Sequence, residues 1–406
     1  MACTVTTANA AYSVVNAAIV AAAPGDVVCV PAGSATWTSQ LNIPKGLTLQ
    51  GAGIGQTNIT SGLNNSNAAL IQYSPGSDVP FELSGFTLDG GNLSQLFGAS
   101  SPSDTVALTQ LKVHDVRFYR GNSRAISTRG LEYGVVYSCT FDDNYIAVWD
   151  GGVYQAGWDY PVTVGGANYL YVEDSTFTQN VNGAFFSETG QGGRLALRHN
   201  TLTSNVGALG LEFWDAHGVN GAYSAGYRGT VASEFYNNTL RTTVGNPRIL
   251  FHRGGKGIVF NNTLTGSGYM QMTEYQGWSY CSADGYPKPT QINNTYYWNN
   301  TITPSLYCAA GGCTSCCPPQ YDGTYIQLNR DYWLPTSGLD ASKPGSPALG
   351  DTYGATDTKK VYKAETAGVW TLVYAAYAYP HPLRGVTSSA APTSVISRLS
   401  RSTASA

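Results

Sequence analysis

Ionisable side chains recur ten to thirteen residues after an apolar anchor in four consecutive segments of the chain. If these segments stack, neighbouring carboxyl groups would lie about 5 Å apart, which is the spacing that a retaining glycosidase gives its acid and its nucleophile. A Ca²⁺-assisted lyase would instead use the carboxylates to hold the metal and an Arg or Lys to take the C5 proton of the sugar. The candidate catalytic residues are Glu188, Glu212, Asp215 and Arg253.

Further residues near these positions have the chemistry to bind sugar. Aromatic rings can stack on sugar rings, and a guanidinium grips a carboxylate in a bidentate fork. We therefore expect Arg253 to contact an acidic polysaccharide, and Asp215 to share the acid and base roles with Glu188 or Glu212 if the protein cleaves it. The candidate carbohydrate-binding residues are Trp214, His217, His252, Lys256 and Glu274.

A structural explanation of the same residues stays open. Polar stacks are ordinary where repeats pile up, and Asp215 with Arg253 could form no more than a cross-repeat salt bridge. The sequence has no Gly-rich phosphate loop, no Gly-x-Ser-x-Gly elbow and no metal-spaced His pair. We expect no metal and no cofactor. Only if the protein is a lyase could it use Ca²⁺.

The elements that would position these side chains follow from an internal repeat. Segments such as Asn200-Thr-Leu-Thr-Ser-Asn205 and Asn262-Thr-Leu-Thr-Gly-Ser267 are copies of one motif, and their apolar anchors lie 23, 36, 25, 38, 24 and 38 residues apart. Period-two strands that turn at Asn every 20-odd residues predict an all-β, right-handed parallel β-helix. The anchors are Phe118, Phe141, Phe177, Leu202, Leu240, Leu264 and Ile302.

Both ends of such a solenoid need covering. An apolar helical stripe in residues 8–23, including Val15 and Ile19, predicts a capping helix over the first strand. We divide the chain into a cap (1–24), the β-helix (25–306), a Cys-rich loop (307–325), a small C-terminal β region (326–386) and an extended Ser/Thr/Ala-rich arm (387–406).

The eight cysteines favour disulfides in an oxidising place. Cys3 precedes the capping helix and Cys29 lies in the strand that it covers, so we expect these two to pair. Cys139 has no obvious partner and is expected to be reduced. Four thiolates of the C-terminal cluster could instead bind zinc, but adjacent Cys316 and Cys317 make poor co-ligands. The cysteines expected to pair mostly among themselves are Cys281, Cys308, Cys313, Cys316 and Cys317.

Composition excludes several function classes. The net charge is −3 and only 12% of residues are charged, which argues against nucleic-acid binding. No apolar stretch approaches the roughly 20 residues of a transmembrane helix, so we expect no membrane insertion. The first Lys or Arg is Lys45, so the start does not look like a secretory signal.

The chain resembles the pectate-lyase-like right-handed β-helix proteins over residues 25–306. The resemblance lies in Gly25-Asp-Val-Val-Cys-Val-Pro-Ala-Gly33, followed by Leu47-Thr-Leu-Gln-Gly-Ala-Gly53. The stretches Arg253-Gly-Gly-Lys-Gly-Ile-Val-Phe-Asn-Asn-Thr263 and Tyr379-Pro-His-Pro-Leu-Arg384 look like uncharacterised β-helix proteins of phages and environmental bacteria. The resemblance implies the fold, which hosts lyases, hydrolases, tailspikes and adhesins alike.

Our first functional hypothesis is a phage virion surface protein: a spike, fibre or capsid-decorating subunit that presents a β-helix to polysaccharide. Its expected place is the virion surface or the extracellular space, its expected partners other virion proteins and copies of itself. The resemblance favours a homotrimer, and the arm Thr387–Ala406 would dock on a neighbouring chain. The alternatives are a secreted polysaccharide lyase or glycoside hydrolase and a purely structural extracellular adhesin.

Overall fold

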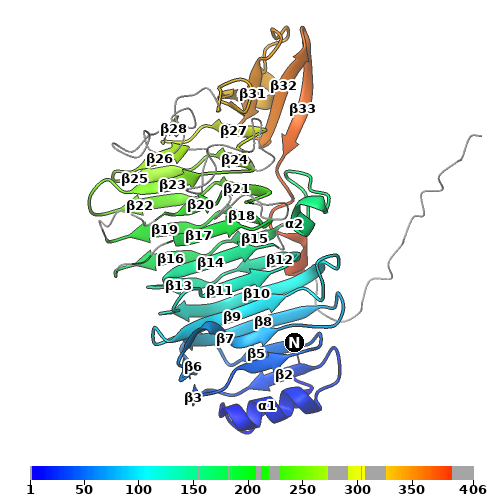
Figure 1. The fold of residues 1–406 in the computed structure, drawn as a ribbon, viewed down its shortest axis with the longest axis vertical. Helices are drawn as coiled ribbons and strands as arrows, with labels where there is room; N and C mark the ends of the chain where they lie inside the picture. The colour runs from blue at the N-terminus through cyan, green and yellow to red at the C-terminus, as the bar shows by residue number, and fades with distance from the viewer. Residues whose placement is uncertain are drawn as a thin grey trace, which may run out of the picture.

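The chain winds into a long stack of β-strand coils (Figure 1). The computed structural model describes residues 2–152, 155–181, 183, 185–206, 212–218, 229–272, 291–302, 304–306 and 326–385. The five C-terminal cysteines, Glu274 and the arm fall outside these residues. No helix in the described ranges is long and apolar enough to cross a membrane.

Each complete coil contributes one strand to each of three faces, and strands of successive coils pair in parallel. The first face comprises β1 (Val5–Thr6), β2 (Val27–Val30), β5 (Thr48–Gly51), β8 (Phe81–Asp89), β10 (Leu108–Tyr119), β12 (Glu132–Tyr137), β15 (Leu170–Glu173), β18 (Arg194–Arg198), β21 (Ala232–Tyr236), β24 (Lys256–Phe260), β27 (Thr295–Trp298) and β29 (Tyr332–Trp333). The second face comprises β3 (Gly33–Trp37), β6 (Thr57–Ser61), β13 (Thr140–Asp142), β16 (Thr176–Gln179), β19 (Thr201–Ser204), β22 (Thr239–Thr242), β25 (Thr263–Thr265) and the C-terminal parts of β8 and β10.

The third face is a separate ten-stranded sheet. Its strands are β4 (Leu41–Ile43), β7 (Asn65–Tyr73), β9 (Ser94–Ser100), β11 (Ile126–Arg129), β14 (Ile146–Gly151), β17 (Phe185–Gly190), β20 (Trp214–Ala216), β23 (Arg248–His252), β26 (Tyr269–Met272) and β28 (Pro304–Leu306). The fold is therefore the expected right-handed parallel β-helix.

The apolar anchors of the repeat line up inside the stack. Phe118 pairs in register with Phe141, and Phe141 with Phe177. Their rings stack with centroids 5.0 and 4.5 Å apart. Leu202 and Leu240 continue the column and are fully buried. The fixed position of the anchor in each motif thus sets the register of the coils.

The first residue of each motif links the coils by hydrogen bonds. The Asn238 amide Nδ2 donates to the Leu197 carbonyl at 3.1 Å, and its Oδ1 accepts from the Asn200 backbone N–H at 3.0 Å. Asn262 repeats the pattern one coil further on, toward Phe235 O and Asn238 N. The residues that precede these positions have left-handed backbone, which Asn and Asp tolerate. They are Ser138, Asp174, His199, Asn237, Asn261 and Asn299.

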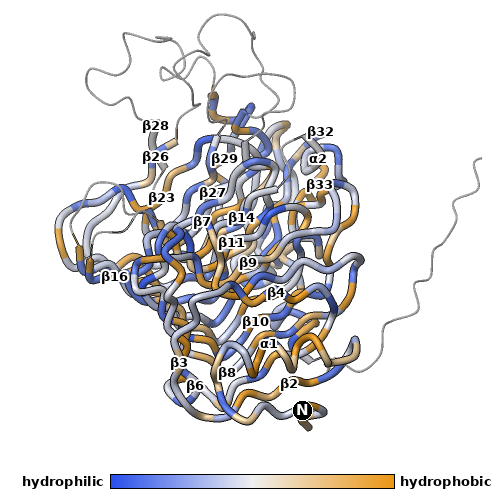
Figure 2. Tube along the Cα trace, turned by 60° about the horizontal axis from the view of Figure 1, so that its bottom comes forward, coloured by the Kyte–Doolittle hydropathy of each residue, from blue (hydrophilic) through white to orange (hydrophobic). Residues whose placement is uncertain are grey.

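Helix α1 (Tyr12–Ala21) lies across the N-terminal end of the stack, and its trace is largely hydrophobic in Figure 2. Val15 and Ile19 are buried against the first coils. The predicted disulfide between Cys3 and Cys29 is present, with the two Cα atoms 5.7 Å apart. Cys139 is a buried free thiol, and burial raises its pKa to about 12.

The C-terminal region first extends the stack and then returns along its side. Tyr332 and Trp333 of β29 pair with β27, so the coils continue past residue 306, where we expected them to end. A four-stranded sheet follows, with β30 (Thr336–Gly338), β31 (Thr352–Ala355), β32 (Lys360–Thr366) and β33 (Val369–Ala375). The described residues also include the 3-10 helices η2 (Asp340–Ser342) and η3 (Pro382–Gly385) and the short helix α2 (Gln155–Asp159).

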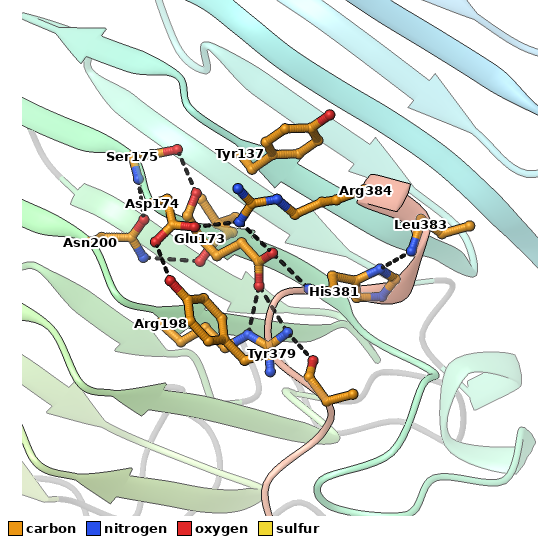
Figure 3. Close-up of polar contacts among 12 residues, drawn as sticks. Tyr137, Glu173, Asp174, Ser175, Arg198, Asn200, Tyr379, His381, Leu383 and Arg384 are labelled. Carbon is orange, nitrogen blue, oxygen red and sulfur yellow. Dashed lines mark hydrogen bonds and ion pairs between the residues drawn. The ribbon is translucent and has the colours of Figure 1, made fainter. Parts of the chain in front are cut away.

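Residues 376–385, here called the strap, run down the first face toward β12 and β10 (Figure 1). The strap closes a buried ion network around Glu173 and Arg198, whose side chains are fully buried (Figure 3). Arg198 donates to the Tyr377 and Ala378 carbonyls at 2.8 and 2.7 Å. Glu173 accepts from the His381 backbone N–H at 2.9 Å and from Arg384 at 3.0 Å.

The stacked motif asparagines are here called the asparagine column. Replacing Asn238 by Ala tests how much their hydrogen bonds contribute to the stability of the fold. The change leaves the Asn200 N–H and the Leu197 carbonyl buried without this partner, so we expect the free energy of unfolding to fall by about 2 to 4 kcal/mol. Thr239→Ala, at the neighbouring exposed position, should change it by less than about 0.5 kcal/mol. Chemical denaturation measures both, and equal losses would show that the column does not stabilise the stack.

The strap network makes a second stability prediction. Glu173→Gln preserves the shape of the side chain but leaves the buried Arg198 charge uncompensated, so we expect a loss of about 3 to 5 kcal/mol. Faster amide hydrogen exchange should appear in residues 376–385. The matched change at exposed Glu365 should alter neither measurement. Unchanged exchange in Glu173→Gln would show that the ion network does not hold the strap.

Candidate functional site

Outward side chains of the third face form a column that crosses six strands. Side chains alternate along a strand, so each outward residue lies beside the outward residue of the next coil, about 4.8 Å away. The pairing registers join Ser127 of β11, Trp149 of β14, Glu188 of β17, Asp215 of β20, Phe251 of β23 and Gln271 of β26.

The pairing of Glu188 with Asp215 brings two carboxyl groups together. Asp215 is fully buried, and both of its oxygens are engaged by Arg253. The Arg253 Nε donates to Asp215 Oδ1 at 2.9 Å, and its Nη2 donates to Oδ2. The guanidinium carbon lies 4.4 Å from the centre of the Phe251 ring. The expected salt bridge between consecutive coils is therefore present, and it fixes Asp215 in place.

Glu188 is in a different environment. It is half-buried, and no hydrogen bond or ion pair reaches its carboxyl group from the residues that the structure describes. Burial, and then the charge of Asp215, raise the Glu188 pKa to about 7, against the opposing effects of Arg253 and Arg124. Two carboxyl groups at strand spacing thus differ sharply, since one is clamped and the other can gain or lose a proton near neutral pH.

Glu212 lies on the same face but is closed off by Arg248. Its carboxyl Oε1 accepts from Arg248 Nε at 3.0 Å, and the residue is 1% exposed. Arg248 also donates to Gln271 at 3.1 Å. Burial raises the Glu212 pKa to about 7, with Arg248 acting in the opposite direction. Glu212 can hold a proton, but a ligand at the surface cannot reach it.

Two of the predicted sugar-binding residues point into the core. Trp214 is fully buried, and its Nε1 donates to Ser233 Oγ at 2.7 Å. His252 is also fully buried and contacts the Gly254 carbonyl at 3.0 Å. Their neighbours Asp215 and Arg253 face outward, so strand alternation turns these two inward. The prediction that Trp214 and His252 bind sugar is therefore wrong.

The other predicted binding residues are divided between faces. His217 joins the site: its Nδ1 donates to the Gly218 carbonyl at 2.9 Å, and burial and Arg253 lower its pKa to about 4. His217 is therefore a neutral imidazole beside Glu188. Lys256 lies in β24 on the first face, where burial and Arg194 lower its pKa. Glu274 lies outside the described residues.

Sequence reasoning missed Arg124. Its guanidinium carbon lies 4.1 Å above the centre of the Trp149 ring. Trp149 is the neighbour of Glu188 in the outward column. Trp149 follows its anchor Phe141 by eight residues, which is outside the ten-to-thirteen window used to align the coils. Arg124 follows its own anchor, Phe118, by only six residues, so the spacing pattern gave no signal for it.

The donor groups do not fit calcium. Glu188, Asp215 and His217 each offer one ligand atom, and these atoms lie within 4.8 Å of one another. Calcium takes six to eight oxygen ligands. Here the Asp215 oxygens are engaged by Arg253 and the third donor is a nitrogen.

Comparison with known proteins agrees on the fold. A family model described as "Right handed beta helix region" matches residues 63–240. A search of the curated proteins finds no match. Among solved structures, the A-modules of the Azotobacter vinelandii mannuronan C-5 epimerases AlgE6 and AlgE4 are 17% and 18% identical, with TM-scores of 0.47 and 0.41. Each alignment covers 72% of this chain, and 82% and 84% of the epimerase chains.

A viral protein is also similar. ORF18 of Geobacillus virus E2 is 13% identical with a TM-score of 0.39, over 89% of this chain and 82% of that one. Identities this low do not carry a function from one chain to another.

The electrostatic coupling of the two carboxyl groups can be measured. Asp215→Asn removes the negative charge that raises the Glu188 pKa and frees Arg253 to approach Glu188. Both effects lower the Glu188 pKa, so we expect it to fall from about 7. NMR titration of the glutamate carboxyl carbons gives the value, with Asp115→Asn on the first face as the control. A Glu188 pKa that stays near 7 in Asp215→Asn would contradict this account.

Proposed function

We propose that this right-handed parallel β-helix protein acts on polysaccharides at its third face, with Glu188 as the residue that transfers the proton. One observation carries the proposal: Glu188 is half-buried and lacks a partner among the described residues, while the adjacent Asp215 is fully engaged. A group with a pKa of about 7 is suited to acid–base catalysis at neutral pH. A purely structural carboxyl group would be expected to have a partner.

The environment of the second carboxyl group favours elimination over hydrolysis. A retaining hydrolase needs a second carboxylate free to attack the sugar, and Asp215 is buried with both oxygens held by Arg253. Arg248 binds one oxygen of Glu212, and this carboxyl group is only 1% exposed, so it is not free to attack a sugar either. Elimination needs one base: Glu188 takes the proton from C5 of an acidic sugar, the C5–H electrons form the C4=C5 double bond, and the C4–O bond breaks. Solvent protonates the leaving oxygen.

We also propose where this activity is used. The Cys3–Cys29 disulfide supports an oxidising location, which suits the extracellular space or the surface of a phage particle. A virion role as spike, fibre or decorating subunit, and a trimer formed through the arm, stay predictions from the sequence. Detection of the chain by mass spectrometry in purified phage particles, with its mass by light scattering, tests both.

Replacing Glu188 by Gln tests the proposed function. We expect the rate of cleavage to fall at least about a hundredfold, because the base is lost while the shape is kept. In the unmodified protein kcat/KM should rise with pH through about 7 and then level off, because the ionised form of Glu188 is active. The charged groups around Glu188 are Arg124, Glu212, Asp215 and Arg253, with neutral His217 beside them.

The assay incubates the protein with uronate and neutral glycans and follows unsaturated ends by ultraviolet absorbance and reducing ends separately. Reducing ends without unsaturated ends would identify a hydrolase instead. Glu365→Gln, at an exposed position on β32, is the control and should retain full activity. Equal activity of Glu188→Gln and Glu365→Gln would refute the assignment of Glu188.

A further inference from the structure

Arg124 is a cation without a partner beside the proposed catalytic residue. Within the described part of the chain, no hydrogen bond or ion pair reaches its guanidinium, and its Nε is buried. It lies over the face of the Trp149 ring, with the guanidinium carbon 4.1 Å from the ring centre. Burial of an unpaired charge is costly, so an anion that pairs with Arg124 would recover part of that cost.

Two other arginines of this face are already paired. Arg248 holds Glu212, and Arg253 holds Asp215. Arg124 and Glu188 influence each other's pKa through space, yet no ion pair joins them. Arg129, exposed at the end of β11, adds a second positive charge that is close enough to lower the Arg124 pKa, after the larger effect of burial. Two arginines without an ion pair among the described residues, Arg124 and Arg129, therefore lie near Glu188.

We propose that Arg124, stacked on Trp149, binds the carboxylate of an acidic sugar and so selects charged over neutral polysaccharide at this face. The inference rests on the proposed function, because the acidic sugar that Arg124 binds would lie beside Glu188. The planar guanidinium presents parallel N–H groups that match the two oxygens of a carboxylate. The Trp149 ring holds the Arg124 guanidinium in place through a cation–π contact.

This assignment replaces the expectation for Arg253. The bidentate bond to Asp215 uses the Nε and Nη2 groups with which Arg253 would grip a sugar carboxylate. To bind an acidic sugar through the same fork, Arg253 would have to release a fully buried aspartate. Arg124 has no such bond to break, so it can bind an anion at no cost to the fold.

Paired ligands separate charge recognition from the rest of binding. Hexamers of galacturonate, mannuronate and glucuronate are each compared with the same hexamer after its carboxylates are reduced to primary alcohols. Calorimetry with the full chain gives the dissociation constants, and Glu188→Gln prevents turnover during the measurement. We expect at least one acidic hexamer to bind about tenfold or more tightly than its reduced form.

Two variants of Arg124 in the same Glu188→Gln background assign the effect. Arg124→Gln should weaken binding of the acidic hexamer to the level of its reduced form and leave the reduced form unchanged. Arg124→Lys should restore part of the affinity, because it keeps the charge and loses the fork. An equal loss for both hexamers in Arg124→Gln, or no preference for any acidic hexamer in the parent, would overturn the proposal.

The two proposals can fail separately. Arg124-dependent binding of an acidic hexamer by a protein that modifies no glycan would support this inference and refute catalysis at Glu188. Turnover that is lost in Glu188→Gln but unchanged in Arg124→Gln would support catalysis at Glu188 and refute the binding role of Arg124.

Discussion

The register of the coils is the constraint on which the rest of the structure depends. Neighbouring coils can align along the axis in only one way, because the anchors stack inside and the asparagine column forms hydrogen bonds at each turn. Every outward side chain therefore has a neighbour at strand spacing. On the third face this forces Glu188 against Asp215. Two carboxylates so close cannot both stay charged without compensation. Arg253 compensates Asp215, while burial, and then the charge of Asp215, raise the pKa of Glu188.

The first and third faces use the same ionic groups to different ends. On the first face the strap brings Arg384 and backbone groups to Glu173 and Arg198, so this buried pair is satisfied, whereas Glu132 of the same face keeps a buried carboxyl oxygen without a hydrogen-bond partner. On the third face two ion pairs are closed in the same manner, but Arg124 and Glu188 stay apart. Satisfied networks stabilise a fold, whereas unpaired groups at a surface are expected where a ligand completes them. Glu132 is 1% exposed, whereas Glu188 is half-buried and in contact with solvent, which is why we place function on the third face.

The sequence predicts the fold well because the features that determine it lie at fixed spacing. Each anchor follows the first residue of its motif by two positions, so one alignment reveals all the coils. The site is harder to predict, because turns of variable length separate each anchor from the outward residue of its coil. The separation is eleven residues for Glu188, thirteen for Asp215 and eight for Trp149. Alternation alone could have placed Trp214 inside. The strap could not be foreseen, because Arg198 binds a carbonyl 180 residues further along the chain.

The structural and the functional explanations of the polar wall each account for part of it. Two ion pairs join neighbouring coils, Asp215 with Arg253 and Glu212 with Arg248. The stacking of the coils explains such pairs without any ligand. The same explanation fails for Glu188 and Arg124. A structural role would have joined these oppositely charged groups, since an ion pair would remove the desolvation cost that each now bears. Trp149 instead holds the guanidinium beside the carboxyl group, so that Arg124 can bind the carboxylate of an acidic sugar while Glu188 takes the C5 proton of that sugar.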